Sequence, residues 1–173
     1  MNCLLNCMLL FLPITAWNLI FTSKLPLAYS AEIFGKDTAS FIAYGENFFR
    51  LLVFLPPILM PLRIETQTQK IGLRIYMAGT AIYFLSWLAQ IYFPKSAWSL
   101  SSFGFLAPAY TPLIWLIGIG LIGSALYFSS PFRSWMYIAI SIIFIGFHLS
   151  HTWTINLRKL QLASSEIIYG VIS

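Results

Sequence analysis

Five long apolar segments divide this chain and constrain its fold more than any other feature. They cover residues 4–21, 40–62, 75–93, 112–128 and 135–153. Each is close to the roughly 20 apolar residues that a helix needs to cross the hydrocarbon core of a bilayer. Backbone groups in lipid must be satisfied within the structure, so each segment is expected to be a helix. The sequence therefore predicts an all-α bundle of five transmembrane helices, forming a single integral membrane domain over residues 1–173.

The composition agrees with a membrane protein. Only 9% of the residues are charged, against about 25% in soluble domains, and the mean hydropathy is +0.81. The net charge is +5, but the basic residues are scattered singly near the ends of the apolar segments, which argues against a nucleic-acid partner. Cys3 and Cys7 form no redox or zinc pattern. We expect a multi-pass protein of an inner or plasma membrane, with the lipid bilayer as its partner.

The segment boundaries follow from polar residues and prolines. No Lys or Arg precedes the first apolar segment, which is longer than the core of a usual signal peptide, so we expect it to be retained. Residues 63–74 are the most polar stretch and are expected to be a loop. Residues 96–111 are expected to be an interfacial connection, with Pro112 opening the next helix. Gly120 and Ser124 form a small-xxx-small pair that favours close helix packing.

The second segment carries Glu46, Asn47 and Arg50. Charged residues inside the hydrocarbon core are costly and usually mark a functional site. Glu46 and Arg50 are four residues apart, so they lie on one face of a helix and can form an ion pair. Pro56 and Pro57 lack the N–H that continues a helix, which predicts a kink beyond Arg50. A pair that only pins this helix to its neighbours is an equally open interpretation.

Polar residues are expected to gather in one half of the membrane. Consecutive helices alternate in direction, so the ends of the first, third and fifth segments and the start of the second lie on one side, which we call side B. The candidate ligand-binding residues in that half are Asn18, Glu46, Asn47, Arg50, Gln90, His148 and His151. The other half, towards side A, is mainly aliphatic and glycine-rich. This distribution predicts a polar pocket open to side B, with the short basic loops of side A favouring a cytoplasmic position.

The two histidines permit more than one chemistry. His148 and His151 are three residues apart and, with Glu46, could form a two-histidine, one-carboxylate metal set. Arg50 competes for that carboxylate, so hydrogen-bonded histidines are the preferred interpretation. The sequence contains no G-x-S-x-G, H-E-x-x-H or Walker motif. No catalytic residue, metal ligand or cofactor is therefore assigned.

The preferred function is the binding or transport of a small polar or amphipathic molecule. Arg50 would hold an anionic group, Glu46 would balance the charge, and the remaining candidate residues would supply hydrogen bonds. One alternative is a membrane-embedded enzyme that uses His148 and His151 on a lipid-soluble substrate. Another is a structural or assembly subunit of a membrane complex. A homo-oligomer is compatible with each of these functions.

Overall fold

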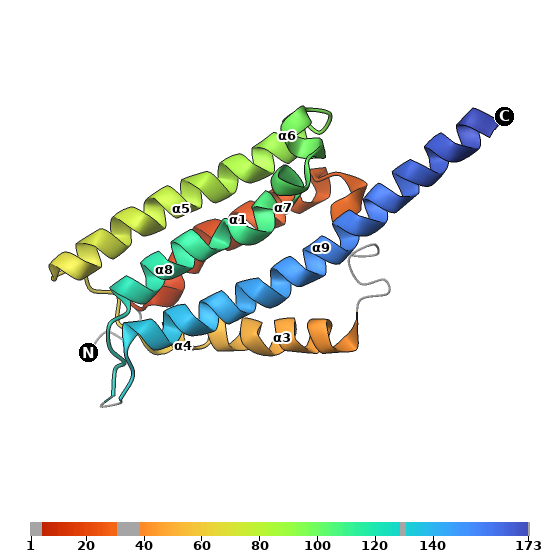
Figure 1. Cartoon of the computed structure of the whole chain (residues 1–173). Coiled ribbons are helices and arrows are strands. Elements are labelled where there is room, and N and C mark those ends of the chain that lie inside the picture. Colours follow the sequence, from red (N-terminus) through yellow and green to blue (C-terminus); the bar gives the residue numbers. More distant parts are fainter. Residues whose placement is uncertain (1–4, 31–38, 129–130, 173) are drawn as a thin grey trace.

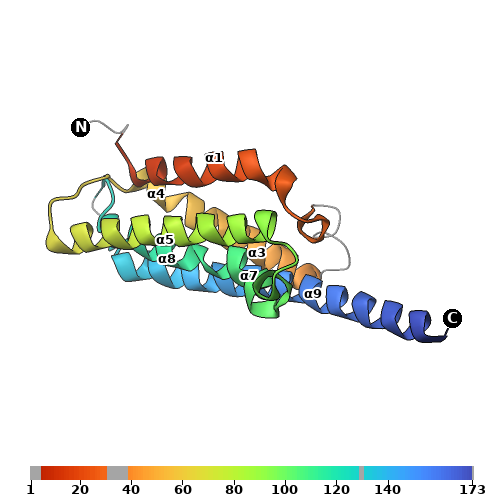
Figure 2. The same cartoon turned by 90° about the horizontal axis from the view of Figure 1, so that it is seen from above.

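All regular elements in the described part of the chain are helical. The computed structural model describes the backbone of residues 5–30, 39–128 and 131–172, and the side chains of these residues up to Gln161. The long helices lie roughly side by side, and the C-terminal part of the last one projects beyond the others (Figure 1). A view from above shows the first helix on one side of this bundle (Figure 2). The all-α prediction is confirmed.

The helices of the described residues follow in this order along the chain. A 3₁₀ turn, η1 (Cys7–Phe11), leads into α1 (Leu12–Phe21), and two further 3₁₀ turns follow, η2 (Thr22–Lys24) and η3 (Leu27–Tyr29). The remaining helices are α3 (Ser40–Phe54), α4 (Pro56–Leu59), α5 (Gln67–Tyr92), α6 (Ala97–Leu100), α7 (Ser102–Tyr110), α8 (Pro112–Ile122) and α9 (Ser134–Ile172).

Within the described residues, five helical stretches are long and apolar enough to cross a membrane, as the sequence predicted. These candidate spans are Cys7–Lys24, Ser40–Leu59, Gln67–Tyr92, Ser102–Ile122 and Ser134–Gln161. Successive spans run in opposite directions (Figure 1). The closest helix pairs are α5 with α8 and α3 with α9, and α8 also packs on α9. The end of α1 and the start of α3 therefore lie in the same half of the bundle.

The expected loop over residues 63–74 is wrong for most of its length, because α5 already begins at Gln67. A capping box forms this start. The Thr66 hydroxyl accepts from the Gln69 backbone N–H at 3.3 Å, and Gln69 Oε1 accepts from the Thr66 N–H at 3.0 Å. Two N–H groups that a helix start leaves unsatisfied are thereby paired. Polar side chains thus extend this helix beyond its apolar part.

The expected interfacial connection over residues 96–111 is wrong for its second half, because the fourth candidate span already begins at Ser102. Ser96 and Ser101 each accept a backbone hydrogen bond with the side chain, and these caps start α6 and α7. Helix α7 continues directly into α8, which begins at Pro112 as expected. Since α8 ends at Ile122, Ser124 lies outside it, and the predicted small-xxx-small pair with Gly120 is not formed on one helix. The last helix begins near its predicted start and is longer than predicted.

Glycines allow α5 and α8 to approach closely. A Cβ atom at Gly79 would lie 2.5 Å from the backbone nitrogen of Trp115, and one at Gly118 would lie 2.5 Å from that of Tyr76. Real Cβ atoms do not approach backbone atoms this closely, so both positions require glycine at this helix separation. Close helix packing in the fourth segment therefore occurs at Gly118, and not through the predicted pair of Gly120 and Ser124.

The predicted break after Arg50 is present at Leu55, between α3 and α4. Pro57 has no N–H to donate to the carbonyl of Val53, four residues earlier. The hydroxyl of Tyr137, a fully buried residue of α9, donates to this carbonyl at 3.2 Å. A neighbouring helix thereby satisfies the group that proline leaves free, which is how helix breaks are tolerated in apolar surroundings.

Candidate functional site

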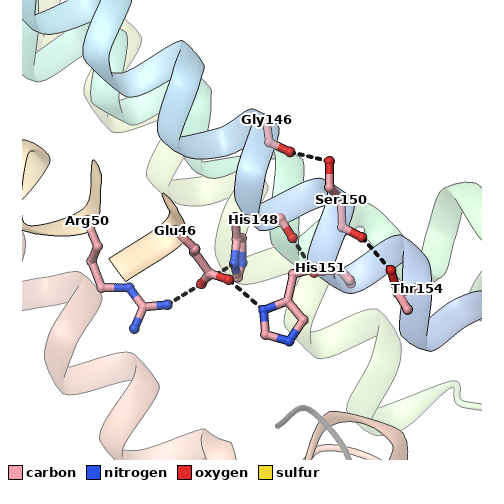
Figure 3. Close-up of polar contacts among 8 residues, drawn as sticks. Glu46, Arg50, Gly146, His148, Ser150, His151 and Thr154 are labelled. Carbon is pink, nitrogen blue, oxygen red and sulfur yellow. Dashed lines mark hydrogen bonds and ion pairs between the residues drawn. The ribbon is translucent and has the colours of Figure 1, made fainter. Parts of the chain in front are cut away.

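The carboxylate of Glu46 is the centre of a polar cluster that joins α3 to α9. Its side chain is only 4% exposed. Arg50, one turn further along α3, forms an ion pair with Oε1 through its Nη2. From α9, His148 Nδ1 lies 3.0 Å from Oε1 and His151 Nδ1 lies 2.6 Å from Oε2 (Figure 3). Both carboxylate oxygens are therefore engaged.

The cluster determines how the two imidazoles are oriented. An ionised carboxylate can only accept hydrogen bonds, so both histidines donate their Nδ1–H groups to Glu46. The ring of His148 also stacks on Phe144, with centroids 5.8 Å apart and planes within 11°. In a neutral imidazole whose Nδ1 carries the proton, Nε2 is an acceptor. Glu46 thus acts as an orienting group for side chains that a different helix contributes.

Local sequence places each half of the cluster. The spacing of Glu46 and Arg50 puts both on one face of α3, and the spacing of His148 and His151 does the same on α9. The hydroxyl of Thr152 donates to the backbone carbonyl of His148 within α9, at 2.8 Å. It therefore does not compete for Glu46. Ser150 and Thr154 donate to α9 carbonyls in the same way (Figure 3).

A cavity of about 600 Å³ lies beside this cluster. Its size falls within the range of roughly 300–1,000 Å³ that is usual for small-molecule sites. Side chains of α1, α3, α5, α7 and α9, and of the turns after α1, contribute to its wall. The lining residues are Asn18, Thr22, Leu25, Tyr29, Ala43, Glu46, Asn47, Arg50, Tyr83, Trp87, Pro108, Ala109, His148, His151 and Thr152.

Six of the seven candidate residues thus line one cavity, and Gln90 is the exception. Gln90 is 2% exposed and its Nε2 donates to the carbonyl of Gly104 at 2.8 Å. This hydrogen bond ties the end of α5 to α7. The sequence could not assign Gln90 to this contact, because α7 lies in the segment that was expected to be an interfacial connection.

Several cavity residues were not among the candidates. Tyr83 and Trp87 are one turn apart on α5, and helical spacing alone could have found them together. The Tyr83 hydroxyl donates to Asn18 Oδ1 at 2.7 Å, which links α5 to α1. Tyr29 and Pro108 carry no such signal, because both come from predicted connections. Burial raises the pKa of Tyr29, and its protonated hydroxyl donates to the carbonyl of Phe105 at 2.8 Å.

The geometry gives little support to the metal interpretation. Among the described residues, no group of three or more His, Cys, Asp or Glu side chains is arranged to hold a metal ion. The one carboxylate in the cluster already accepts from Arg50 and from both histidines. What this arrangement offers is a set of oriented polar groups beside an open volume.

The fold and the site together define a class: a helical bundle, with five candidate membrane spans among the residues that the structure describes and a polar cavity in one half. No family model matches this chain, and neither a curated protein nor a solved structure matches it.

Proposed function

We propose that this chain is a multi-pass protein of an inner or plasma membrane that binds, and moves, a small polar or amphipathic molecule in the cavity of side B. The observation that carries the proposal is the position of the Glu46 cluster. Charged and polar side chains of α3 and α9 line a cavity of about 600 Å³. A cluster that served only to join two helices would not need an open volume beside it.

The cavity suits a molecule with both polar and apolar parts. Arg50, Asn47 and Asn18 present polar groups, whereas Leu25, Trp87 and other lining residues are apolar. Ligand pockets typically combine a mostly apolar wall with a few placed polar groups that fix orientation. Polar residues buried in membrane-spanning segments commonly mark substrate or ion pathways.

A structural or assembly role is the second candidate, and one observation favours it. The hydrogen bonds that His148 and His151 donate to Glu46 join α3 to α9, so the cluster holds two helices together whether or not a ligand binds. The enzyme alternative stays a prediction. A single experiment separates these functions.

The experiment is native mass spectrometry of the full chain gently extracted in detergent. We expect a bound organic molecule, and we expect Ala43→Phe to remove it by filling the cavity that Ala43 lines. Ala81→Phe is the matched control, because Ala81 lies at an exposed position of α5. An empty protein with a stoichiometric partner chain would favour the structural role. A bound metal lost in a His148→Ala, His151→Ala variant would favour the enzyme.

A further inference from the structure

The two charges of the Glu46–Arg50 pair are not equally available to the cavity. The Glu46 side chain is 4% exposed, whereas that of Arg50 is 46% exposed, and both line the cavity. Both oxygens of the carboxylate are engaged, while Arg50 bonds to Glu46 through Nη2. The guanidinium has five N–H donors, so most of them remain for a ligand. The charge that a ligand meets is therefore positive.

The amide groups beside Arg50 add further donors. Asn18 Oδ1 accepts from Tyr83, which leaves the Asn18 Nδ2 amide to donate into the cavity. Asn47 makes no side-chain hydrogen bond within the described part of the chain, so its amide is also open. A head group that accepts several hydrogen bonds would satisfy these donors. Guanidinium groups pair especially well with carboxylates and phosphates, because the planar fork matches two oxygens.

Part of the wall is apolar. Trp87, which is 7% exposed, Pro108, Ala109 and Leu25 all line the cavity. Such a wall packs against an apolar chain by van der Waals contact, as apolar surfaces do inside a membrane. A free inorganic anion would leave this surface unused.

We infer that the cavity binds an amphipathic oxyanion, with a carboxylate or phosphate head group on Arg50, Asn47 and Asn18 and an apolar chain against the Trp87 wall. This inference rests on the proposed function and names the chemical class of its ligand. Glu46 acts as a positioning residue, because Arg50 and the two histidines already engage both of its carboxylate oxygens.

The test uses the full chain in phosphatidylcholine nanodiscs and the fluorescence of its tryptophans. Three probes share one ω-brominated undecyl chain and differ in the head group: a phosphate, an alcohol and a trimethylammonium. Bromine quenches tryptophan on contact, so a probe in the cavity quenches Trp87. We expect a saturable component of quenching that Trp87→Phe removes and Trp135→Phe, at an exposed position, leaves unchanged. Charge-assisted hydrogen bonds should make the phosphate probe bind about tenfold or more tightly than the alcohol.

Variants test the head-group site. Arg50→Gln should abolish the preference for phosphate, and Arg50→Lys should retain part of it because the charge remains. Asn47→Leu leaves the Glu46–Arg50 pair intact and should lower the affinity for the phosphate probe a few-fold without changing that for the alcohol. It keeps the test decisive if Arg50→Gln does not fold.

Each result either supports or overturns the inference. Equal binding of phosphate and alcohol probes, or a preference for trimethylammonium, would overturn it while leaving the proposed function standing. Displacement of the phosphate probe by inorganic phosphate at equal concentration would show a free-anion site and overturn the role of the apolar chain. Absence of saturable quenching with every probe would overturn both the inference and the binding of amphipathic molecules.

Discussion

Glu46 Oε2 and His151 Nδ1 lie 2.6 Å apart, although 105 positions separate the two residues in the sequence. The contact joins α3 to α9 and occurs beside the cavity, where His148 makes a similar bond to the other carboxylate oxygen at 3.0 Å. The same side chain therefore holds the helices together and orients polar groups that line the cavity.

The ion pair should behave as a coupled unit. Glu46→Gln leaves Arg50 without a counter-ion. We expect it to lower the free energy of unfolding by about 3 kcal/mol. This is the lower end of the usual cost of breaking a buried ion pair, because Arg50 is half exposed. Arg50→Met should cost about 1–2 kcal/mol, since both histidines still donate to Glu46. The double variant should cost less than the sum of the two. Denaturant unfolding in detergent micelles measures this, and additive costs would show that the pair is not coupled.

The donor at His151 should matter more than its ring. His151→Ala removes an N–H donor from the buried carboxylate, and we expect a loss of about 1–3 kcal/mol in the free energy of unfolding. His151→Asn places an amide N–H near the position of Nδ1 and should recover most of that loss. Thermal unfolding of both variants in the same detergent checks this. Equal destabilisation by Ala and Asn would show that packing of the imidazole, and not its hydrogen bond, is what stabilises the fold.

The effect of removing the Tyr137 hydroxyl should depend on Pro57. Tyr137→Phe leaves the Val53 carbonyl without its donor and should cost about 1–2 kcal/mol. In a Pro57→Ala background the chain regains a backbone N–H that can donate to the same carbonyl, so Tyr137→Phe should cost much less there. A double-mutant cycle of unfolding free energies measures the coupling. Identical costs in both backgrounds would contradict the proposed compensation.

The glycines between α5 and α8 should not tolerate a methyl group. Gly79→Ala and Gly118→Ala each place Cβ 2.5 Å from a backbone nitrogen of the facing helix, so the helices must move apart. We expect each to cost about 1–3 kcal/mol. Gly146→Ala in α9 is the matched control. It meets nothing within 4 Å and should be neutral or stabilising by up to about 1 kcal/mol through helix propensity.

For these glycine variants, thermal unfolding in one detergent gives the comparison. A loss of stability in Gly146→Ala equal to that in Gly79→Ala would mean that the close approach of α5 and α8 is not the cause.

Much of the local structure was readable from sequence patterns. Hydropathy gave the number of candidate spans, prolines gave the break at Leu55, and four-residue spacing paired Glu46 with Arg50. Each of these depends on neighbours within a turn or two. Hydropathy did not predict the helix start at Gln67, where the first residues of α5 are polar. It also did not predict α7, which forms in a segment without charged residues. In both places, side-chain caps start a helix that hydropathy does not mark.

The sequence by itself determined that polar residues gather in one half of a five-helix bundle, because apolar length and alternating direction follow from the order of residues alone. Only the tertiary structure decided which helices are neighbours. It brought α9 against α3, where Gly45 leaves room for the ring of Phe147, so that Glu46 meets both histidines, and it directed Gln90 to Gly104 instead. Helix adjacency depends on the fit of side chains that are distant in sequence, and no local pattern records that fit.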